Sequence, residues 1–201
     1  MKIGIIGTGA MSTSLAGAWT RAGHDVLAAG RTSLRTAASH GDLILFAVPA
    51  AAAPGIAAEL ADDLAGRTLL DCTNPIAPGP AGPLLTVPPG SSTAAALASA
   101  APGAAVVKAF NLCHASIWTL DPPVFEGLPL GVPYCASAQE AAARTAALIT
   151  SMQCTPVPCG GLDRAPYLEA TAALAIGVWF AAGSPRAMFP PIAQVPAADP
   201  Q

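Results

Sequence analysis

A glycine-rich turn at the start of the chain constrains its fold more than any other feature. Residues Lys2 to Ile6 have strand character and run directly into the turn, which leads into a helical pattern and a second apolar run, Val26 to Gly30. A strand, a glycine-rich turn, a helix and a second strand within about thirty residues are typical of a dinucleotide-binding β-α-β unit. The sequence therefore predicts a parallel sheet with a ligand at this turn.

The residues of the turn suit a pyrophosphate. Gly7 allows a tight turn out of the strand, and Gly9 lets backbone N–H groups approach phosphate oxygens. The helix that begins near Ala10 offers unpaired N–H groups and a partial positive charge. Ser12 stands where a third glycine is usual, and it is small enough to preserve the match. We predict cofactor contacts from Gly7, Thr8, Gly9, Ala10 and Met11.

The end of the second strand indicates which dinucleotide binds. An NAD site usually carries Asp or Glu there, about twenty residues past the glycines. This chain instead has two arginines and two hydroxyl residues in the segment Gly30 to Arg35, whereas Asp25 lies at the start of the strand. Arginine presents a forked set of donors to a 2′-phosphate, so the pattern favours NADP. The alternative is that Arg31 and Arg35 are solvated loop charges.

Composition excludes several classes of protein. The 201 residues carry a net charge of −3 with scattered basic residues, which gives no footprint for nucleic acid. No run of eighteen apolar residues occurs, and strand character begins at Lys2, so we expect neither a membrane span nor a signal peptide. The five cysteines form no CxxC pair, which is typical of reduced thiols without a metal site. We expect a cytoplasmic protein that binds no nucleic acid, membrane or metal.

The rest of the chain alternates strands and helices. Further strands are predicted over residues 42–48, 68–72, 104–110, 130–135 and 155–159. Helices are predicted over residues 10–22, 54–64, 138–152 and 166–182, with about one helical turn after Arg35 and a short capped helix after Ser91, Ser92 or Thr93. The segments between residues 76–90 and 112–127 are expected to be irregular. The fold class is therefore α/β, a Rossmann-like doubly wound and mostly parallel sheet with a carboxyl-terminal helix and a Pro-rich tail. We divide it into an NADP-binding domain, residues 1–162, and an arm, residues 163–201.

Five motifs together carry a family resemblance. The turn after Lys-Ile-Gly-Ile-Ile is followed by residues 47–49 (Ala-Val-Pro), 71–75 (Asp-Cys-Thr-Asn-Pro), 106–111 (Val-Val-Lys-Ala-Phe-Asn) and 167–169 (Tyr-Leu-Glu). With these motifs the chain resembles the NADPH-dependent coenzyme F420 reductases and their short bacterial relatives, up to about Gly183. The departures are the short second helix and the segment Gly183 to Pro191, where deazaflavin-reducing members carry a Gly-rich segment.

The resemblance implies roles for particular residues. Thr8, Arg31, Thr32 and Arg35 would contact the 2′-phosphate. The remaining cofactor-lining positions would be Ala47, Val48, Pro49, Asn74 and Pro75. Asn111 and its neighbours would face the second substrate, and relatives pair through their carboxyl-terminal region. From the apolar circumference of the last helix we likewise expect a homodimer, with a monomer covered by its own tail as the alternative.

Few residues offer acid–base chemistry. Reduction of an imine or carbonyl needs a proton donor, and His114 follows the fifth strand at the rim where open α/β sheets bind ligands. We name His114 and Asn111 as the candidate catalytic residues, with an ordinary loop histidine as the alternative for His114. Lys108 is expected to be a packing or ion-pair residue, and Tyr134 and Tyr167 to be core aromatics.

Three functions stay open from the sequence. The first is an NADP-dependent oxidoreductase that transfers a hydride between nicotinamide and a small-molecule acceptor. Coenzyme F420 is a candidate for this acceptor. The second is an NADPH-dependent reductase of a small imine or carbonyl without deazaflavin. The third is a non-catalytic NADP-binding sensor. We predict an enzyme, because the NADP half is nearly complete and the acceptor side is open.

Overall fold

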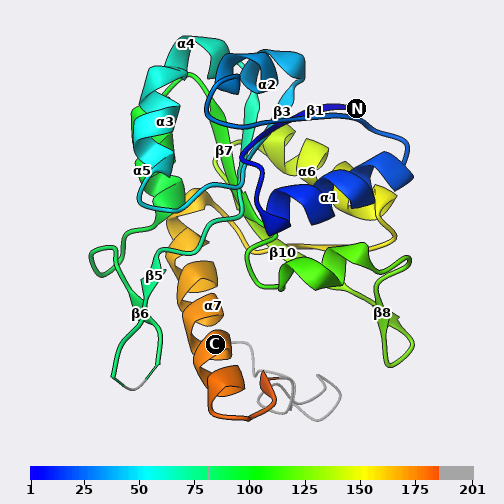
Figure 1. Ribbon diagram of the computed structural model, residues 1–201, viewed down its shortest axis with the longest axis vertical. Helices are drawn as coiled ribbons and strands as arrows, with labels where there is room; N and C mark the ends of the chain where they lie inside the picture. Colours follow the sequence, from blue (N-terminus) through cyan, green and yellow to red (C-terminus); the bar gives the residue numbers. More distant parts are fainter. Residues whose placement is uncertain (81, 186–201) are drawn as a thin grey trace, which may run out of the picture.

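The computed structural model describes residues 1–80 and 82–185, so most of the predicted Pro-rich tail lies outside the described residues. A seven-stranded sheet, in the order β11-β10-β7-β4-β3-β1-β2, forms the centre of the molecule (Figure 1). The predicted Rossmann-like α/β fold is confirmed. The order reverses beside β1, which places a crevice between the ends of β1 and β3.

Five neighbouring strands are parallel, and all but the edge strand β2 are largely buried. They are β2 (Asp25–Ala29), β1 (Lys2–Ile6), β3 (Leu43–Phe46), β4 (Thr68–Asp71) and β7 (Ala105–Ala109). The side chains of β3 and β4 are all buried, as expected for strands covered on both faces. Beyond them, β10 (Gly131–Ala136) runs antiparallel to β7, and β11 (Thr155–Pro158) pairs parallel to β10. Prolines 156 and 158 are tolerated in β11 because it is an edge strand.

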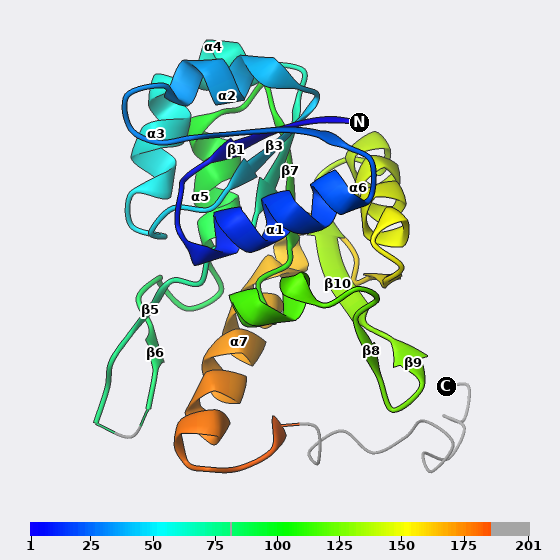
Figure 2. The same cartoon turned by 45° about the vertical axis from the view of Figure 1, so that its right-hand side comes forward.

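Helices cover both faces of the sheet (Figure 2). On one face lie α1 (Ala10–Arg21), α6 (Gln139–Ser151) and the short 3₁₀ helix η1 (Ala115–Thr119), and Trp19 is fully buried in their core. On the other face lie α2 (Leu34–His40), α3 (Ala53–Glu59), α4 (Ala61–Leu64) and α5 (Thr93–Ala100). Ser92 caps α5 by accepting a bond from the Ala95 N–H at 3.1 Å, which confirms the predicted cap.

Several sequence-based boundaries were wrong. The helix predicted over 54–64 is interrupted at Leu60, which leaves helical geometry between α3 and α4. The segment 76–90 contains a hairpin, β5 (Ile76–Ala77) with β6 (Leu84–Leu85). The segment 112–127 contains η1 and β8 (Val124–Phe125), which pairs with β9 (Leu128–Pro129). Two-residue strands have too little alternation to be recognised from sequence.

The second helix is also longer than predicted. It has seven residues, Leu34 to His40, and therefore includes Arg35. It lies so close to β1 that a Cβ atom at Gly4 would be 1.9 Å from the Ala37 carbonyl oxygen. The glycine in the first strand therefore permits a compact helix where a full crossover helix has no room.

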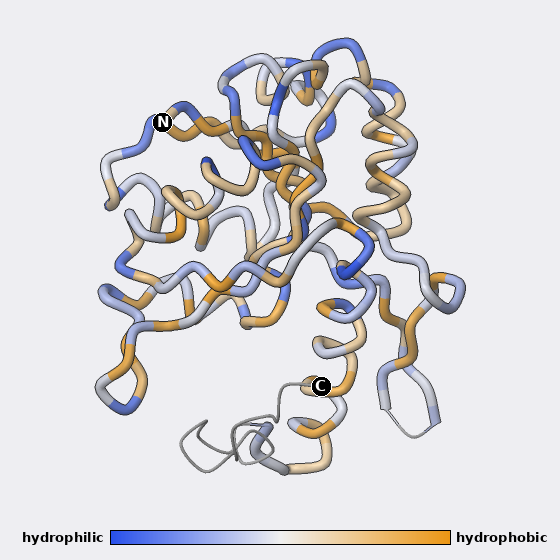
Figure 3. The backbone as a smooth tube through the Cα atoms, turned by 180° about the vertical axis from the view of Figure 1, so that it is seen from behind, coloured by the Kyte–Doolittle hydropathy of each residue, from blue (hydrophilic) through white to orange (hydrophobic). Residues whose placement is uncertain are grey.

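The last helix, α7 (Ala165–Phe180), follows a 3₁₀ turn, η2 (Leu162–Arg164), and extends away from the sheet (Figures 1 and 2). Its first turns pack against the core, where Ala165 and Leu168 are buried. Apolar residues continue along the length of the helix (Figure 3). Tyr167 is 63% exposed beneath the Arg164 guanidinium, 5.1 Å from the ring centroid, so its prediction as a core aromatic was wrong. Tyr134 is buried, as predicted. No helix in residues 1–80 and 82–185 is long and apolar enough to span a membrane.

Candidate NADP and acceptor site

The two glycines of the turn have different functions. Gly7 has a φ of +125°, and a Cβ there would be 2.2 Å from the Ala47 carbonyl oxygen, so the fold itself requires glycine. Gly9 precedes the first turn of α1 with an ordinary φ of −79°, and a Cβ there would meet no atom within 4 Å. The space beside Gly9 is open at the helix N-terminus, as the approach of a pyrophosphate requires.

Ser12 has a structural role in this turn. It is buried, and its hydroxyl donates to the Gly7 carbonyl oxygen at 2.7 Å. The serine in place of the third glycine therefore stabilises the turn. Thr8, Ala10 and Met11 border the same opening, with Thr8 and Ala10 exposed.

Ala47, Val48 and Pro49 follow β3 next to the turn. The Ala47 N–H donates to the Ile6 carbonyl oxygen at 2.9 Å, which holds the loop after β3 against the end of β1. Pro49 is exposed, and Val48 is half-buried. These three residues therefore lie at the reversal of strand order, where the sequence placed the cofactor.

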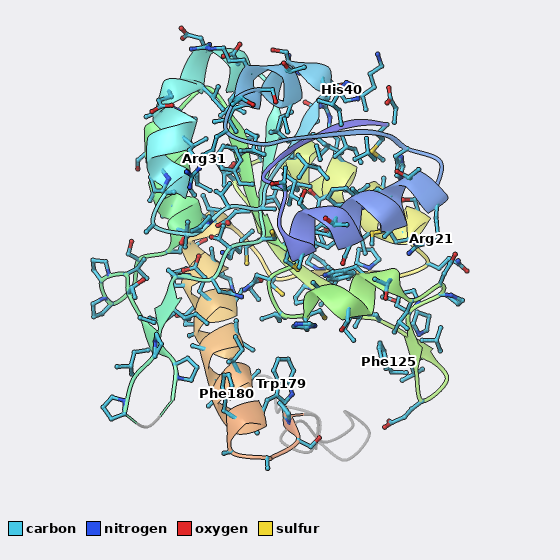
Figure 4. All side chains as sticks on the ribbon, viewed as in Figure 1. Arg21, Arg31, His40, Phe125, Trp179 and Phe180 are labelled. Carbon is cyan, nitrogen blue, oxygen red and sulfur yellow. The ribbon has the colours of Figure 1, made fainter. Side chains whose placement is uncertain are left out.

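A pocket of about 320 Å³ marks the predicted 2′-phosphate site. Arg31, Thr32 and Arg35 all line it, and Arg31 lies in the loop that follows β2 (Figure 4). The Arg35 Nη1 atom is 2.5 Å from Asp63 Oδ2, and its Nη2 donates to the Glu59 carbonyl oxygen at 3.3 Å. The structure thus brings Arg31, Thr32 and Arg35 together, whereas Thr8, also predicted to contact the 2′-phosphate, does not line this pocket. The Arg35 guanidinium is shared with Asp63, an acidic residue of α4.

Asn74 and Asn111 join the carboxyl ends of β4 and β7. The Asn74 Nδ2 atom donates to the Asn111 carbonyl oxygen at 2.8 Å. The Asn111 Nδ2 atom donates to Asn74 Oδ1 at 2.9 Å and to the Leu168 carbonyl oxygen at 3.1 Å. Asn111 Oδ1 is buried without a hydrogen-bond partner. A buried hydrogen-bond acceptor without a partner at the cofactor crevice fits a site where a bound ligand donates the missing hydrogen bond.

A buried ionic cluster lies beside this pair. Lys108 Nζ is 2.9 Å from Asp71 Oδ2 and 2.7 Å from Glu169 Oε1, and it donates to the Thr73 carbonyl oxygen at 2.5 Å. All three charged side chains are fully buried. Lys108 is an ion-pair residue, as predicted, and the cluster fixes α7 to β4 and β7. Burial raises the pKa of Glu169 above its ordinary value, against the opposing effect of Lys108.

Aromatic rings fix the end of β7. Phe110 has a φ of +65°, uncommon for a residue with a side chain, and it contacts Trp19 and Trp118 edge-to-face, with centroids 5.7 and 5.4 Å apart. These contacts stabilise the conformation that turns the chain into Asn111 and the following loop.

The main cavity, of about 560 Å³, lies between this loop, the start of α1 and the side of α7. Predicted site residues Ala10, Met11, Asn74, Asn111 and His114 line it. A second cavity of about 400 Å³ lies on the other side of His114 and reaches the β8–β9 hairpin. The two cavities have four lining residues in common: Leu112, Cys113, His114 and Trp179.

His114 can donate a hydrogen bond. Its Nδ1 atom accepts from the Ser116 N–H at 3.3 Å and lies 2.9 Å from the Ser116 hydroxyl oxygen. In the neutral imidazole this leaves the hydrogen on Nε2. The structure therefore places a potential donor at the wall of both cavities.

The thiols in the cavity are poor nucleophiles. Burial raises the pKa of Cys72 to about 12 and that of Cys113 to about 11. Since the thiolate is the reactive form, this geometry gives no support for Cys113 as a nucleophile beside His114. In residues 1–80 and 82–185, no group of three or more His, Cys, Asp or Glu side chains is arranged to hold a metal ion.

Sequence reasoning missed part of the cavity wall. Phe110 and the α7 residues Ala172, Ile176, Trp179 and Phe180 also line it. The apolar circumference of α7 was the available signal, although it was interpreted only as a dimer surface. Pro75, a predicted cofactor residue, is buried and lines none of the three cavities described above.

Comparisons with known proteins agree with this arrangement. Residues 2–37 match the family described as NADP oxidoreductase, coenzyme F420-dependent. The chain is 31% identical over 183 residues to metalloreductase STEAP3 of Rattus norvegicus, a match that covers 84% of this chain and spans 36% of that protein's length.

Solved structures extend the comparison across the fold. A candidate F420-dependent NADP reductase from Arthrobacter sp. FB24 is 26% identical, with a TM-score of 0.81 over 92% of this chain and 96% of that one. An imine reductase from Streptomyces aurantiacus has the same fold at 15% identity, with a TM-score of 0.63 over 89% of this chain and 61% of that one. The resemblance inferred from the motifs is confirmed.

Proposed function

This chain is similar to the NADP-dependent oxidoreductases of the F420-reductase family, and from that premise we propose that it oxidises NADPH with a small-molecule acceptor held in the cavity beside α7. One observation supports this most directly. The first residues of α1, Ala10 and Met11, line the same 560 Å³ cavity as Asn74 and Asn111, and they directly follow the open space at Gly9. Bound NADPH would supply a hydride from C4 of its nicotinamide.

In this proposal, different residues of the chain bind different parts of the cofactor and the acceptor. Gly9 and the first turn of α1 bind the pyrophosphate, and Arg31, Thr32 and Arg35 bind the 2′-phosphate. Asn111 Oδ1, buried without a partner, accepts from the ligand, and its amide nitrogen is held by Asn74 and Leu168. Apolar walls from Met11, Phe110 and α7 exclude water from the reacting rings.

Oxidised coenzyme F420 is the first acceptor that we propose, on the family match. A second candidate is a small imine or carbonyl, since the His114 Nε2–H at the cavity wall suits a reaction that needs a proton donor. A non-catalytic NADP sensor has no need of an acceptor cavity.

The test is NADPH oxidation, followed with and without the oxidised deazaflavin. We expect rapid oxidation only when the acceptor is present. Oxidation with carbonyls or imines alone would select the second candidate, and binding without any oxidation would contradict the enzyme proposal.

Gly9→Val supplies the matched variant. The position has room for a side chain in the fold, so the variant should fold normally and lose NADPH binding. A folded Gly9→Val protein that binds NADPH as tightly as the wild type would move the cofactor to another site.

A further inference from the structure

Lys108 makes one contact that an ion pair does not require. An ammonium group can donate three hydrogen bonds, and the structure provides three acceptors. Two of them are the carboxylates of Asp71 and Glu169, at 2.9 and 2.7 Å. The third is the carbonyl oxygen of Thr73, at 2.5 Å. This fully buried cation therefore also binds the backbone of the loop that follows β4.

The cluster holds Thr73 on both sides. The Thr73 N–H donates to Asp71 Oδ1 at 2.8 Å, and the Thr73 carbonyl oxygen accepts from Lys108 Nζ. The Thr73 hydroxyl oxygen is buried without a hydrogen-bond partner among the described residues, so the polar contacts hold this residue through its backbone. Together they fix the direction in which the chain enters Asn74, which lines the main cavity.

Asn74 and Asn111, the amide pair, have a single hydrogen-bonding arrangement. Asn111 Nδ2 donates to two oxygens that cannot donate in return, Asn74 Oδ1 and the Leu168 carbonyl oxygen. Asn74 Nδ2 likewise donates to the Asn111 carbonyl oxygen. Rotation of either amide by half a turn would bring oxygen against oxygen. The direction of the Asn111 Oδ1 acceptor is therefore fixed by the pair.

Two connections run between Lys108 and the amide pair. One is the Thr73 backbone, which directly precedes the first asparagine. The other is Glu169 on α7, whose carboxylate contacts Lys108 and whose preceding residue, Leu168, supplies an acceptor to the pair. A change at Lys108 should therefore reach both amides, although Lys108 itself is fully buried behind them.

We infer that Lys108 is a positioning residue that holds the amide pair in the one arrangement that binds the nicotinamide half of the cofactor. This rests on the proposed function and identifies what orients its nicotinamide end. Asp71 and Glu169 hold the ammonium group in place, and the Thr73 backbone transmits its position to the pair. The nicotinamide carboxamide has N–H groups that suit the Asn111 Oδ1 acceptor.

The two halves of the cofactor should depend on Lys108 differently. In the proposed function, the adenosine half is bound at the Arg31 pocket, which contains no member of the cluster or of the amide pair. Adenosine 2′,5′-bisphosphate has the 2′-phosphate but lacks the nicotinamide half. A comparison of its affinity with that of NADP⁺, by isothermal titration calorimetry, therefore separates an effect on the nicotinamide end from a general effect on the fold.

The test uses a neutral variant that combines Asp71→Asn, Lys108→Met and Glu169→Gln. The substitutions preserve side-chain size, and the two amides retain oxygens that can accept from the Thr73 and Thr93 N–H groups. Replacement of buried charges by neutral groups of similar volume is often tolerated. We expect the Kd for NADP⁺ to rise about tenfold and the Kd for adenosine 2′,5′-bisphosphate to change less than about twofold. Equal weakening of both ligands, no weakening of either, or an unfolded variant by circular dichroism would overturn the inference.

Asn74→Ala tests whether Lys108 acts through the amide pair. Asn74 is half-buried at the cavity wall, and its substitution should weaken NADP⁺ about tenfold while leaving adenosine 2′,5′-bisphosphate unchanged. Added to Asn74→Ala, the three substitutions of the neutral variant should cost less than about a further twofold, because residues that act through one network have non-additive effects. Additive losses would show that Lys108 does not act through the pair.

Thr145→Val is the control for loss of a buried polar contact. Thr145 is fully buried on α6, and its hydroxyl donates to the Ala141 carbonyl oxygen at 2.8 Å. Both ligands should bind this variant as they bind the wild type. Selective weakening of NADP⁺ here would show that any change in the core reaches the nicotinamide end, and the inference would fail. Failure of adenosine 2′,5′-bisphosphate and NADP⁺ to bind the wild type would contradict the proposed function instead.

Discussion

Gly7 and Gly9 are two residues apart, yet glycine is required at each for a different reason. At Gly7 the backbone conformation and the Ala47 carbonyl leave no place for a Cβ atom. At Gly9 the fold leaves room for a side chain, and on the proposed function it is the bound ligand that requires glycine. A sequence motif records both as glycine, so only the structure separates the folding requirement from the binding requirement.

Arg35 illustrates a competition that the sequence did not reveal. The segment Gly30 to Arg35 was predicted to bind the 2′-phosphate, and the residues do line one pocket. The extra turn of α2 directs Arg35 toward α4, however, where Asp63 already binds its guanidinium. In the proposed binding mode, the 2′-phosphate and Asp63 would share or exchange this cation.

Asp63→Asn should tighten NADPH binding. The Arg35 side chain is 70% exposed and that of Asp63 is 22% exposed, so solvent screens the pair in part, and its loss should release about 0.5 to 1 kcal/mol, or roughly a two- to fivefold lower Kd for NADPH. The Kd for NADH, which has no 2′-phosphate, should not change. Isothermal titration calorimetry with both nucleotides measures the difference.

Asp62→Asn is the control for that prediction. Asp62 is exposed on the same helix, one residue away from the carboxylate that contacts Arg35. Equal tightening in the two variants would indicate a general charge effect, and competition for Arg35 would then be the wrong explanation.

At the scale of elements, α7 is fixed to the sheet by charge as well as by apolar contact. Glu169 accepts from the Thr93 N–H at 3.0 Å and contacts Lys108, so one carboxylate connects α7 with β7 and with the start of α5. Two carboxyl groups share the single Lys108 ammonium group. The attraction of Lys108 therefore does not offset the effect of burial, and the pKa of Glu169 is raised.

The stability contributed by Glu169 should therefore fall as the pH rises. A carboxyl group whose pKa is higher in the folded state contributes fully below its unfolded pKa, near 4.5, and loses that contribution as the pH rises through the folded value. We expect the free energy of unfolding of the wild type, relative to Glu169→Gln, to decrease as the pH rises above 4.5. Urea titrations of both proteins across this range give the difference.

Glu140→Gln controls for loss of a carboxylate alone. Glu140 is an exposed residue of α6 whose partner is Arg144 on the same helix. A difference between wild type and Glu169→Gln that is constant or rises with pH would contradict the assignment.

The sequence predicted the parallel core because its strands are continuous apolar runs between recognisable turns. It also predicted where the glycine turn, Ala47 to Pro49 and Asn74 lie in the fold, since each of them directly follows a strand. It could not predict the two small hairpins, because pairs of two residues carry no periodicity. Nor could it predict the wall formed by Trp179 and Phe180, because that wall depends on the direction in which α7 leaves the sheet.

At the scale of the whole molecule, α7 presents an apolar surface away from the sheet. Leu174, Trp179 and Phe180 are 55%, 47% and 82% exposed. The last two border the acceptor cavity, so a second copy of the chain bound along α7 would also cover that cavity. We propose the homodimer on this basis.

Leu174→Glu should convert a dimer into a monomer. Leu174 is exposed on α7 and lines neither cavity, so the charge should weaken association, lower acceptor turnover and leave NADPH affinity unchanged. Multi-angle light scattering at micromolar concentration reports the mass. Leu120→Glu, at an exposed leucine outside α7, should remain dimeric. A monomeric wild type with full activity would contradict the dimer.

The central claim is direct hydride transfer from NADPH to a ring bound in the cavity beside α7. It is tested by turnover with NADPH carrying deuterium on one or the other face of nicotinamide C4, with the oxidised deazaflavin as acceptor. Because the hydrogen at C5 of a reduced deazaflavin does not exchange with water, mass spectrometry of the product records its origin. We predict deuterium in the product from one of the two labelled cofactors and none from the other. A product without deuterium from either, or NADPH left unoxidised, would contradict the account.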